Sequence, residues 1–101
     1  MTPPYFCATK IAAFHGRGKG DYAASHDLED FLAVVDGRRE LPAEIRSSAS
    51  DVRRYVATEV DRFLADADFI DTVPGCLPPD AASQARLPLL LERLRTIASA
   101  G

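Results

Sequence analysis

Opposite charges are separated within one short segment near the N-terminus, residues 10–30, whose sequence is KIAAFHGRGKGDYAASHDLED. Its first part is cationic and holds no acid, whereas its second part is acidic and holds no Lys or Arg. The titratable residues are, in order, Lys10, His15, Arg17, Lys19, Asp21, His26, Asp27, Glu29 and Asp30. A fold does not require this separation, but a site for an anionic ligand, with or without a metal ion, can use it. We therefore expect function to lie in this segment.

Two cationic features of the segment suit an anionic ligand. Lys10 falls on an apolar helical face, where its ammonium either reaches out to water or is held at the edge of a pocket to meet a carboxylate or phosphate. The turn GRGKG at 16–20 lets backbone amides approach a phosphate, and Arg17 and Lys19 add charge. Neither a Walker A motif nor a GxGxxG motif is present. A solvated flexible loop is the alternative interpretation of this turn.

The acidic phrase SHDLED at 25–30 suits metal or hydroxyl chemistry. His26 and Asp30 are four residues apart and Asp27 and Asp30 are three apart, so each pair can share one helical face. Such a face can hold a divalent cation or place a carboxylate beside a reacting hydroxyl. Alternatively, the acids gather here because the helix dipole favours negative charge at an N-terminus. The pattern HDxxD is too short to define a metal site, and we assign none.

Other residues carry weaker signals. We expect His15 to be a cation near the C-terminus of a helix, where the dipole favours positive charge. Arg53, Arg54 and Arg62 suit the solvated face of a helix. Neither a G-x-S-x-G turn nor a catalytic Cys–His pattern occurs, so the sequence does not indicate a serine or cysteine nucleophile.

The composition predicts one soluble globular domain over residues 1–101, with 47% hydrophobic and 27% charged residues. The net charge of −3 gives no bulk attraction for nucleic acid. Cys7 suits a core and Cys76 an exposed loop, and the two form no metal or disulfide pattern, which favours the cytoplasm. We find neither a signal peptide nor an apolar run long enough to cross a membrane. So small a core invites a homodimer or another partner.

Helical periodicity runs through almost the whole sequence. Apolar residues recur three and four positions apart and predict helices over 4–15, 26–36, 41–46, 50–65 and 80–98. The apolar face of the fourth is expected to hold Val52, Tyr55, Val56, Val60, Phe63 and Leu64. The connection 66–79 is apolar enough to be ordered on the core, and no run alternates as a strand does. We predict an all-α fold, a compact irregular bundle of four to five helices with no substantial sheet.

The ends of these helices are marked by capping and breaking residues. Thr2, Ser25, Ser50 and Asp80 are expected to be N-caps, because their side-chain oxygens can accept from unpaired amides of the first turn. The glycine-rich turn is expected to end the first helix. Pro88 lies inside the last helical pattern and should kink it or split it in two.

Residues 5–38, YFCATKIAAFHGRGKGDYAASHDLEDFLAVVDGR, resemble the helical part of bacterial nucleotidyltransferase-like proteins of the AbiEii/AbiGii toxin type. That family commonly shows a Lys in a phrase like ATKLxAF, an Arg-containing turn, and then a K/H-D-hydrophobic-x-D phrase that opens a helix. The matching positions here are Thr9, Lys10, Arg17 and the HDLED of residues 26–30.

The resemblance implies roles for particular positions. Lys10 would contact nucleotide phosphate, Asp27 would lie near the transfer site or position a substrate hydroxyl, and Asp30 would support it. The family's catalytic core is an N-terminal α/β half with a G-S turn and a strand whose paired acids hold magnesium, and the 101 residues contain neither. Mg²⁺ and a nucleotide are thus implied only where such a half is supplied. Conditional on that half, the candidate catalytic residues are Asp27 and Asp30, and the candidate ligand-binding residues are Lys10, Arg17, Lys19 and His26.

These observations support functions of different classes. In the first, the chain is the helical accessory half of a nucleotidyltransferase-like protein and is inactive alone. In the second, it is a non-catalytic interaction or regulatory module, for example of a toxin–antitoxin system. A third is nucleotide or metal binding without turnover. A polar pocket around Lys10, Arg17, Asp27 and Asp30, which we expect to converge, would favour the first function, and an apolar surface patch would favour the second.

Overall fold

The computed structural model describes residues 2–18, 21–22 and 24–101, and the side chain of Arg17 lies outside that description. Every regular element of these residues is helical, which confirms the all-α class. The four long helices are α1 (Pro3–Ala13), α2 (His26–Gly37), α4 (Ser50–Leu64) and α7 (Leu87–Ala98). The short ones are α3 (Leu41–Arg46), α5 (Ala67–Thr72) and α6 (Ala81–Gln84), with a π-helical turn η1 (Phe14–Gly18) and a 3₁₀ turn η2 (Val73–Cys76).

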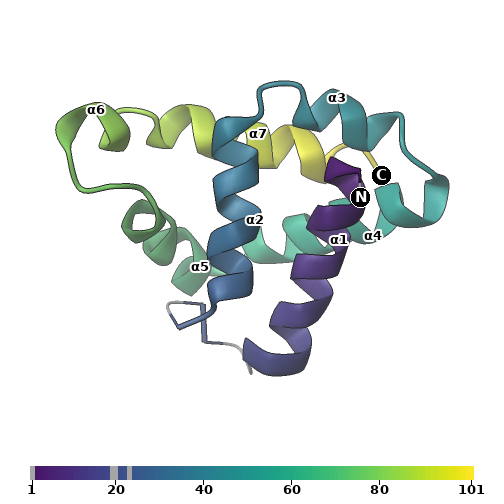
Figure 1. The fold of residues 1–101 in the computed structure, drawn as a ribbon, viewed down its shortest axis with the longest axis horizontal. Helices are drawn as coiled ribbons and strands as arrows, with labels where there is room; N and C mark the ends of the chain where they lie inside the picture. The colour runs from purple at the N-terminus through teal and green to yellow at the C-terminus, as the bar shows by residue number, and fades with distance from the viewer. Residues whose placement is uncertain (1, 19–20, 23) are drawn as a thin grey trace.

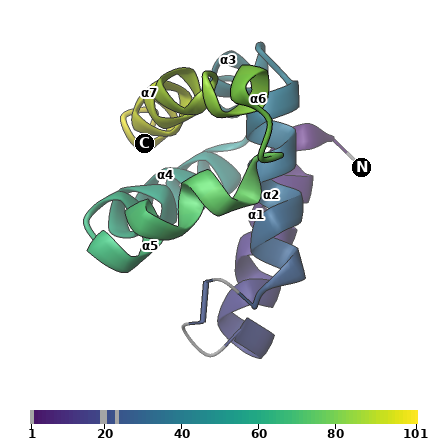
Figure 2. The ribbon, with the colours of Figure 1, turned by 90° about the vertical axis from the view of Figure 1, so that its left-hand side faces the viewer.

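The long helices form two crossed pairs. α1 and α2 lie side by side and antiparallel in front, and α4 and α7 cross behind them (Figure 1). Turned by a quarter, the molecule shows α1 and α2 as one upright layer, with the other helices extending from it on one side (Figure 2). α1 contacts both α2 and α4, and α7 contacts α4, α3 and α2, so the core lies where the two pairs cross.

The core is built from the helical stripes that the periodicity predicts. It includes Cys7, Ile11 and Phe14 of the first helical segment, Leu28, Phe31, Leu32 and Val35 of α2, Val56, Val60 and Phe63 of α4, and Leu90, Leu94 and Ile97 of α7. The prediction for Tyr55 is wrong, because its side chain is 36% exposed at the edge of α4. Each fully buried aliphatic or aromatic side chain contributes about 1.5–3 kcal/mol relative to an exposed one.

Two of the four predicted N-caps form side-chain bonds of the expected kind. Ser25 Oγ accepts from the Leu28 amide at 3.1 Å, and Asp80 Oδ2 accepts from the Ser83 amide at 3.0 Å. Thr2 occupies the cap position of α1 without a side-chain bond. The prediction for Ser50 is wrong, because Ser50 is already the first helical residue and Ala49 holds the cap position.

The α-helix ends at Ala13, two residues before the predicted end near His15. The π-helical turn η1 follows it and runs to Gly18, which lies inside the glycine-rich turn that is predicted to end the helix. Phe14 is buried and the His15 ring binds a carboxylate of α4, so both residues hold this turn against the core. Gly16 has open space where a Cβ would stand, so the turn does not require glycine there.

The predicted break near Pro88 is confirmed as a split into α6 and α7. Ala85 and Arg86 form a turn between the two helices. Pro88 lies in the first turn of α7, where a missing amide costs little. The connection 66–79 is ordered, as predicted, but it also contains α5 and η2, which bury Phe69 and Val73.

Candidate functional site

Lys10 lies on the side of α1 that faces α2. Its Nζ is 2.9 Å from Asp30 Oδ2 and 3.7 Å from Asp27 Oδ1. The hydrogen bond with Asp30 is the main cause that raises the pKa of Lys10 above its ordinary value, so this amine stays charged across the physiological range. Lys10, Asp27 and Asp30 therefore converge, as the sequence predicts, and we call these three residues the Lys10 cluster.

The local folding of α2 explains why the two acids converge. Ser25 caps α2, so Asp27 enters its first turn and Asp30 its second, on one face because they are three residues apart. The apolar stripe of α2 packs on α1 and brings this face to Lys10. Asp27 also lies in the first turn of α2, where the helix dipole favours an acid, as the alternative interpretation of the acidic phrase predicts.

The Lys10 cluster is partly open to water. The side chain of Asp27 is 13% exposed, that of Lys10 is 25% exposed and that of Asp30 is 53% exposed. Lys10 Nζ also lies 5.4 Å from the centroid of the Phe6 ring, within cation–π range. One ammonium and two carboxylates leave the cluster with a formal charge of −1 when all three are ionised, so a bare anion meets little attraction there.

Of the remaining sequence candidates for ligand binding, only His26 has a side chain within the described part of the chain. His26 is almost wholly exposed, and its Nδ1 lies 3.6 Å from Glu29 Oε2 instead of pairing with Asp30. Arg17 belongs to the π-helical turn by its backbone, but its side chain lies outside the described part of the chain, as does all of Lys19. Within the described residues, no group of three or more His, Cys, Asp or Glu could hold a metal ion.

A second polar cluster was missed by the sequence reasoning. Glu59 of α4 is buried, with His15 Nε2 2.7 Å from its Oε1 and Arg62 Nη1 3.1 Å from its Oε2. The His15 ring thus joins η1 to α4, whereas the Arg62 side chain is 73% exposed and keeps the solvated position that the sequence predicts. One signal could have found this cluster, since Glu59 stands three residues after Val56 and four before Phe63 in the apolar stripe.

Tyr22 joins the segment before α2 to the start of α5. Its hydroxyl donates to Asp66 Oδ2 at 2.7 Å, and its ring stacks on Phe14 with centroids 5.3 Å apart. Burial, followed by this hydrogen bond, raises the pKa of Tyr22 to about 12. The same bond is the main cause that lowers the pKa of Asp66. The pair fixes the entry to α2 against the core.

An apolar groove lies away from the Lys10 cluster. It has a volume of about 500 Å³ and runs between the first turn of α1, at Pro3 and Tyr5, and the start of α4, at Ala49 and Val52. Tyr5 is 53% exposed there. An exposed aromatic ring in an apolar groove is typical of a surface that contacts another molecule.

Comparisons with protein-family models, with curated protein sequences and with solved structures find no match to this chain. Among the described residues, each helix is too short or too polar to span a bilayer.

Proposed function

We propose that this chain is the helical accessory half of a nucleotidyltransferase-like protein of the AbiEii/AbiGii type. It contributes phosphate-binding and substrate-positioning residues and works with a separate or rejoined catalytic half in the cytoplasm, where its two free thiols remain reduced. The observation that carries the proposal is the convergence of Lys10 with Asp27 and Asp30 from two helices. These are the positions that the resemblance assigns to phosphate and to the acceptor.

The charges of the Lys10 cluster support a role that depends on a partner half. Asp27 and Asp30 already neutralise Lys10, so the chain alone attracts a phosphate weakly. Mg²⁺ usually binds through one or two carboxylates together with substrate phosphates and water. Mg²⁺ on the nucleotide would be held by the acids of the catalytic half, and Lys10, still in contact with Asp30, would then meet a phosphate oxygen.

In the transfer itself, an acceptor hydroxyl attacks the α-phosphorus of the nucleotide and pyrophosphate leaves. Lys10 stabilises negative charge on the phosphates, and Asp27 orients the acceptor hydroxyl and accepts its proton as the new bond to phosphorus forms. Asp30 holds Lys10 in place through the 2.9 Å contact. Bound Mg²⁺ would neutralise part of the negative charge of the phosphates.

The test begins with the DNA directly upstream of the Met1 codon, where we expect a G-S turn and a paired-acid strand to be encoded. In the rejoined protein, Lys10→Ala and Asp27→Asn should each lower transfer of labelled nucleotide about 100-fold or more. Glu29→Gln is the matched control, because Glu29 is an exposed acid of α2 outside the cluster, and it should leave transfer unchanged. No such coding sequence upstream, together with no binding of Mg²⁺–nucleotide by the chain, would overturn the proposal.

The apolar groove at Tyr5 favours a second candidate function. There the chain is a non-catalytic interaction or regulatory module, for example of a toxin–antitoxin system, or it forms a homodimer. Light scattering of the purified chain tests the homodimer: a dimer that Tyr5→Ser dissociates would support it. A protein that is monomeric at all concentrations would exclude the homodimer. The groove would then bind a different protein, and Tyr5→Ser should abolish co-purification of that partner.

A further inference from the structure

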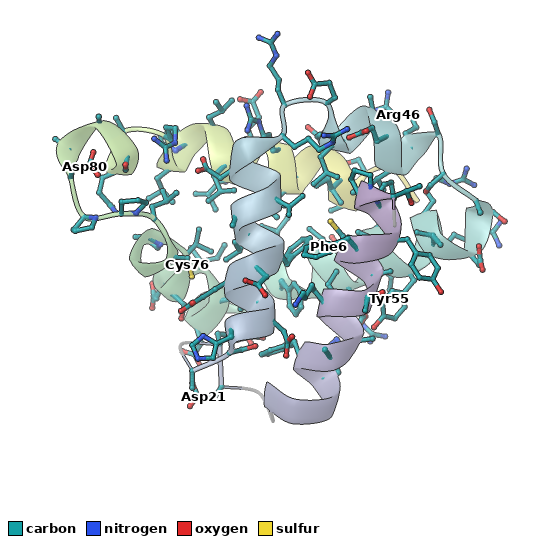
Figure 3. The ribbon with its side chains drawn as sticks, viewed as in Figure 1. Phe6, Asp21, Arg46, Tyr55, Cys76 and Asp80 are labelled. Atoms are coloured by element: carbon teal, nitrogen blue, oxygen red, sulfur yellow. The ribbon has the colours of Figure 1, made fainter. Side chains whose placement is uncertain are left out.

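A small hollow lies beside the Lys10 cluster, between the N-terminal half of α1 and the C-terminal half of α2. It has a volume of about 250 Å³ and is lined by Pro3, Phe6, Val34 and Arg38. Figure 3 shows Phe6 in the space between the two helices. Three of the four lining side chains are apolar, and one of them is aromatic.

The hollow adjoins the Lys10 cluster along both helices. Phe6 lies one turn before Lys10 on α1, and Val34 lies one turn after Asp30 on α2. Because the two helices are antiparallel, both steps lead toward the same end of the helix pair. Each step covers about 6 Å along its helix axis. Lys10 Nζ also lies 5.4 Å from the centre of the Phe6 ring. The face therefore presents an apolar end and a charged end about one helical turn apart.

Arg38 forms a fixed, flat wall of the hollow. Its Nε and Nη2 donate to the two carboxylate oxygens of Glu44 at 2.6 and 2.7 Å, so the guanidinium plane cannot turn freely. Its charge is already matched by Glu44, which makes it a poor site for phosphate. A guanidinium held in this way can still stack on a flat ring.

We propose that the hollow between Phe6 and Val34 is the base subsite of a nucleotide whose phosphates lie on Lys10. This inference rests on the proposed function and adds the binding position of the base. The volume of about 250 Å³ lies below the usual range for whole small-molecule pockets, about 300–1,000 Å³, so the hollow suits one ring system. A planar base stacks on Phe6, and the phosphates extend one turn along the helices to Lys10.

Two probes separate the two ends of such a ligand. Adenosine, which has no phosphate, should shift the NMR signals of Phe6 and Val34 in the purified chain. Tripolyphosphate with Mg²⁺ should instead shift the signals of Lys10 and Asp27. ATP with Mg²⁺ should shift both groups of signals.

Substitutions then test whether the hollow contributes to affinity. Phe6→Leu removes the ring but keeps an apolar side chain, and it should weaken ATP binding about tenfold while leaving tripolyphosphate binding unchanged. Val34→Phe fills the hollow and should have the same effect, provided that circular dichroism shows an unchanged fold, since Val34 also packs against the core. Tyr5→Leu is the matched control, since it removes an aromatic ring of α1 that lies in the other groove.

The possible failures are distinguishable. If Lys10→Ala abolishes ATP binding but Phe6→Leu and Val34→Phe bind ATP as the wild type does, the base subsite is wrong and the proposed function stands. Adenosine shifts at Tyr5 and Val52 would also refute the base subsite. If neither tripolyphosphate nor ATP affects Lys10 or Asp27, the base subsite is wrong, and the proposed function fails with it when the upstream DNA also encodes no catalytic half.

Discussion

Single side chains hold distant segments together at several places, and Tyr22 and Asp66 are the clearest pair. Asp66 accepts from the Tyr22 hydroxyl and from the amide of Asp68, and both bonds lower its pKa. A carboxyl whose folded pKa is lowered stabilises the fold fully above its unfolded pKa. That stabilising contribution is lost as the pH falls through the lowered pKa of the carboxyl in the folded state.

Tyr22→Phe should therefore destabilise the protein most at neutral pH. The variant keeps the ring stacking but loses the hydroxyl donor, so the folded pKa of Asp66 moves up toward its ordinary value. The difference in Tm from the wild type should shrink as the pH is lowered below the usual carboxyl range, because a protonated Asp66 gains less from the phenol. Thermal unfolding followed by circular dichroism against pH measures this. Tyr5→Phe, at an exposed phenol, should show no such pH-dependent difference.

The contacts of the Lys10 cluster can be predicted from the sequence, whereas those of Glu59 cannot. Lys10, Asp27 and Asp30 could be predicted to meet because spacing within each helix fixes their faces, and the two helices follow each other in sequence. The contact between His15 and Glu59 joins segments more than forty residues apart. Finding it requires the packing of η1 on α4, which the sequence pattern does not specify. The sequence also does not decide whether His26 pairs with Glu29 or with Asp30, since partners three and four residues away compete on a helix.

At the level of elements, α2 is fixed at both of its ends. Ser25 caps its N-terminus, and at its C-terminus Arg93 Nη1 donates to the carbonyls of Val35 and Asp36 at 3.0 and 2.6 Å. Arg86 binds the Asp36 carboxylate through two further hydrogen bonds. The helix that carries both acids of the candidate site is thus held by contacts independent of that site.

Ser25→Ala should cost about 1 kcal/mol of unfolding free energy, the usual effect of losing an N-cap side chain. Ser25 is 6% exposed, so water replaces the lost acceptor poorly. Thr2→Ala is the matched control, because Thr2 occupies the cap position of α1 without a side-chain bond. Urea denaturation of the two variants measures the difference. Equal losses would mean that the Ser25 hydroxyl adds nothing to the stability of α2.

The long helices could be predicted from their apolar period, because four stripes with clear spacing form the core. The short elements α5 and η2 are not predicted as helices, because the connection that holds them contains Pro74, Gly75, Pro78 and Pro79, which are typical of a loop. The equally short α3 is predicted with its bounds. The extension of α1 into η1 has a similar origin: glycine spacing indicates a stop, but contacts of Phe14 and His15 with α4 keep the turn wound. Tertiary contacts outweigh local preference at these places.

For the whole molecule, the thiol of Cys7 can report global opening. Cys7 is fully buried, and burial raises its pKa to about 12, whereas Cys76 is only partly buried. In a Cys76→Ser variant, Cys7 should react with a thiol reagent at least about 1,000-fold more slowly in the native than in the denatured protein. The Cys7→Ser variant is the control, in which Cys76 should react while the protein is folded. Fast native labelling of Cys7 would show that α1 opens without global unfolding.

The last helix also has a consequence for synthesis. α7 supplies Leu90, Leu94 and Ile97 to the core and contacts α4, α3 and α2. A ribosome adds about 5–20 residues per second, so α1 and α4 emerge some seconds before the helix that covers them. During that interval the apolar faces of the nascent chain are open to a chaperone. Chaperone binding can thus begin on the ribosome, before the bundle is closed.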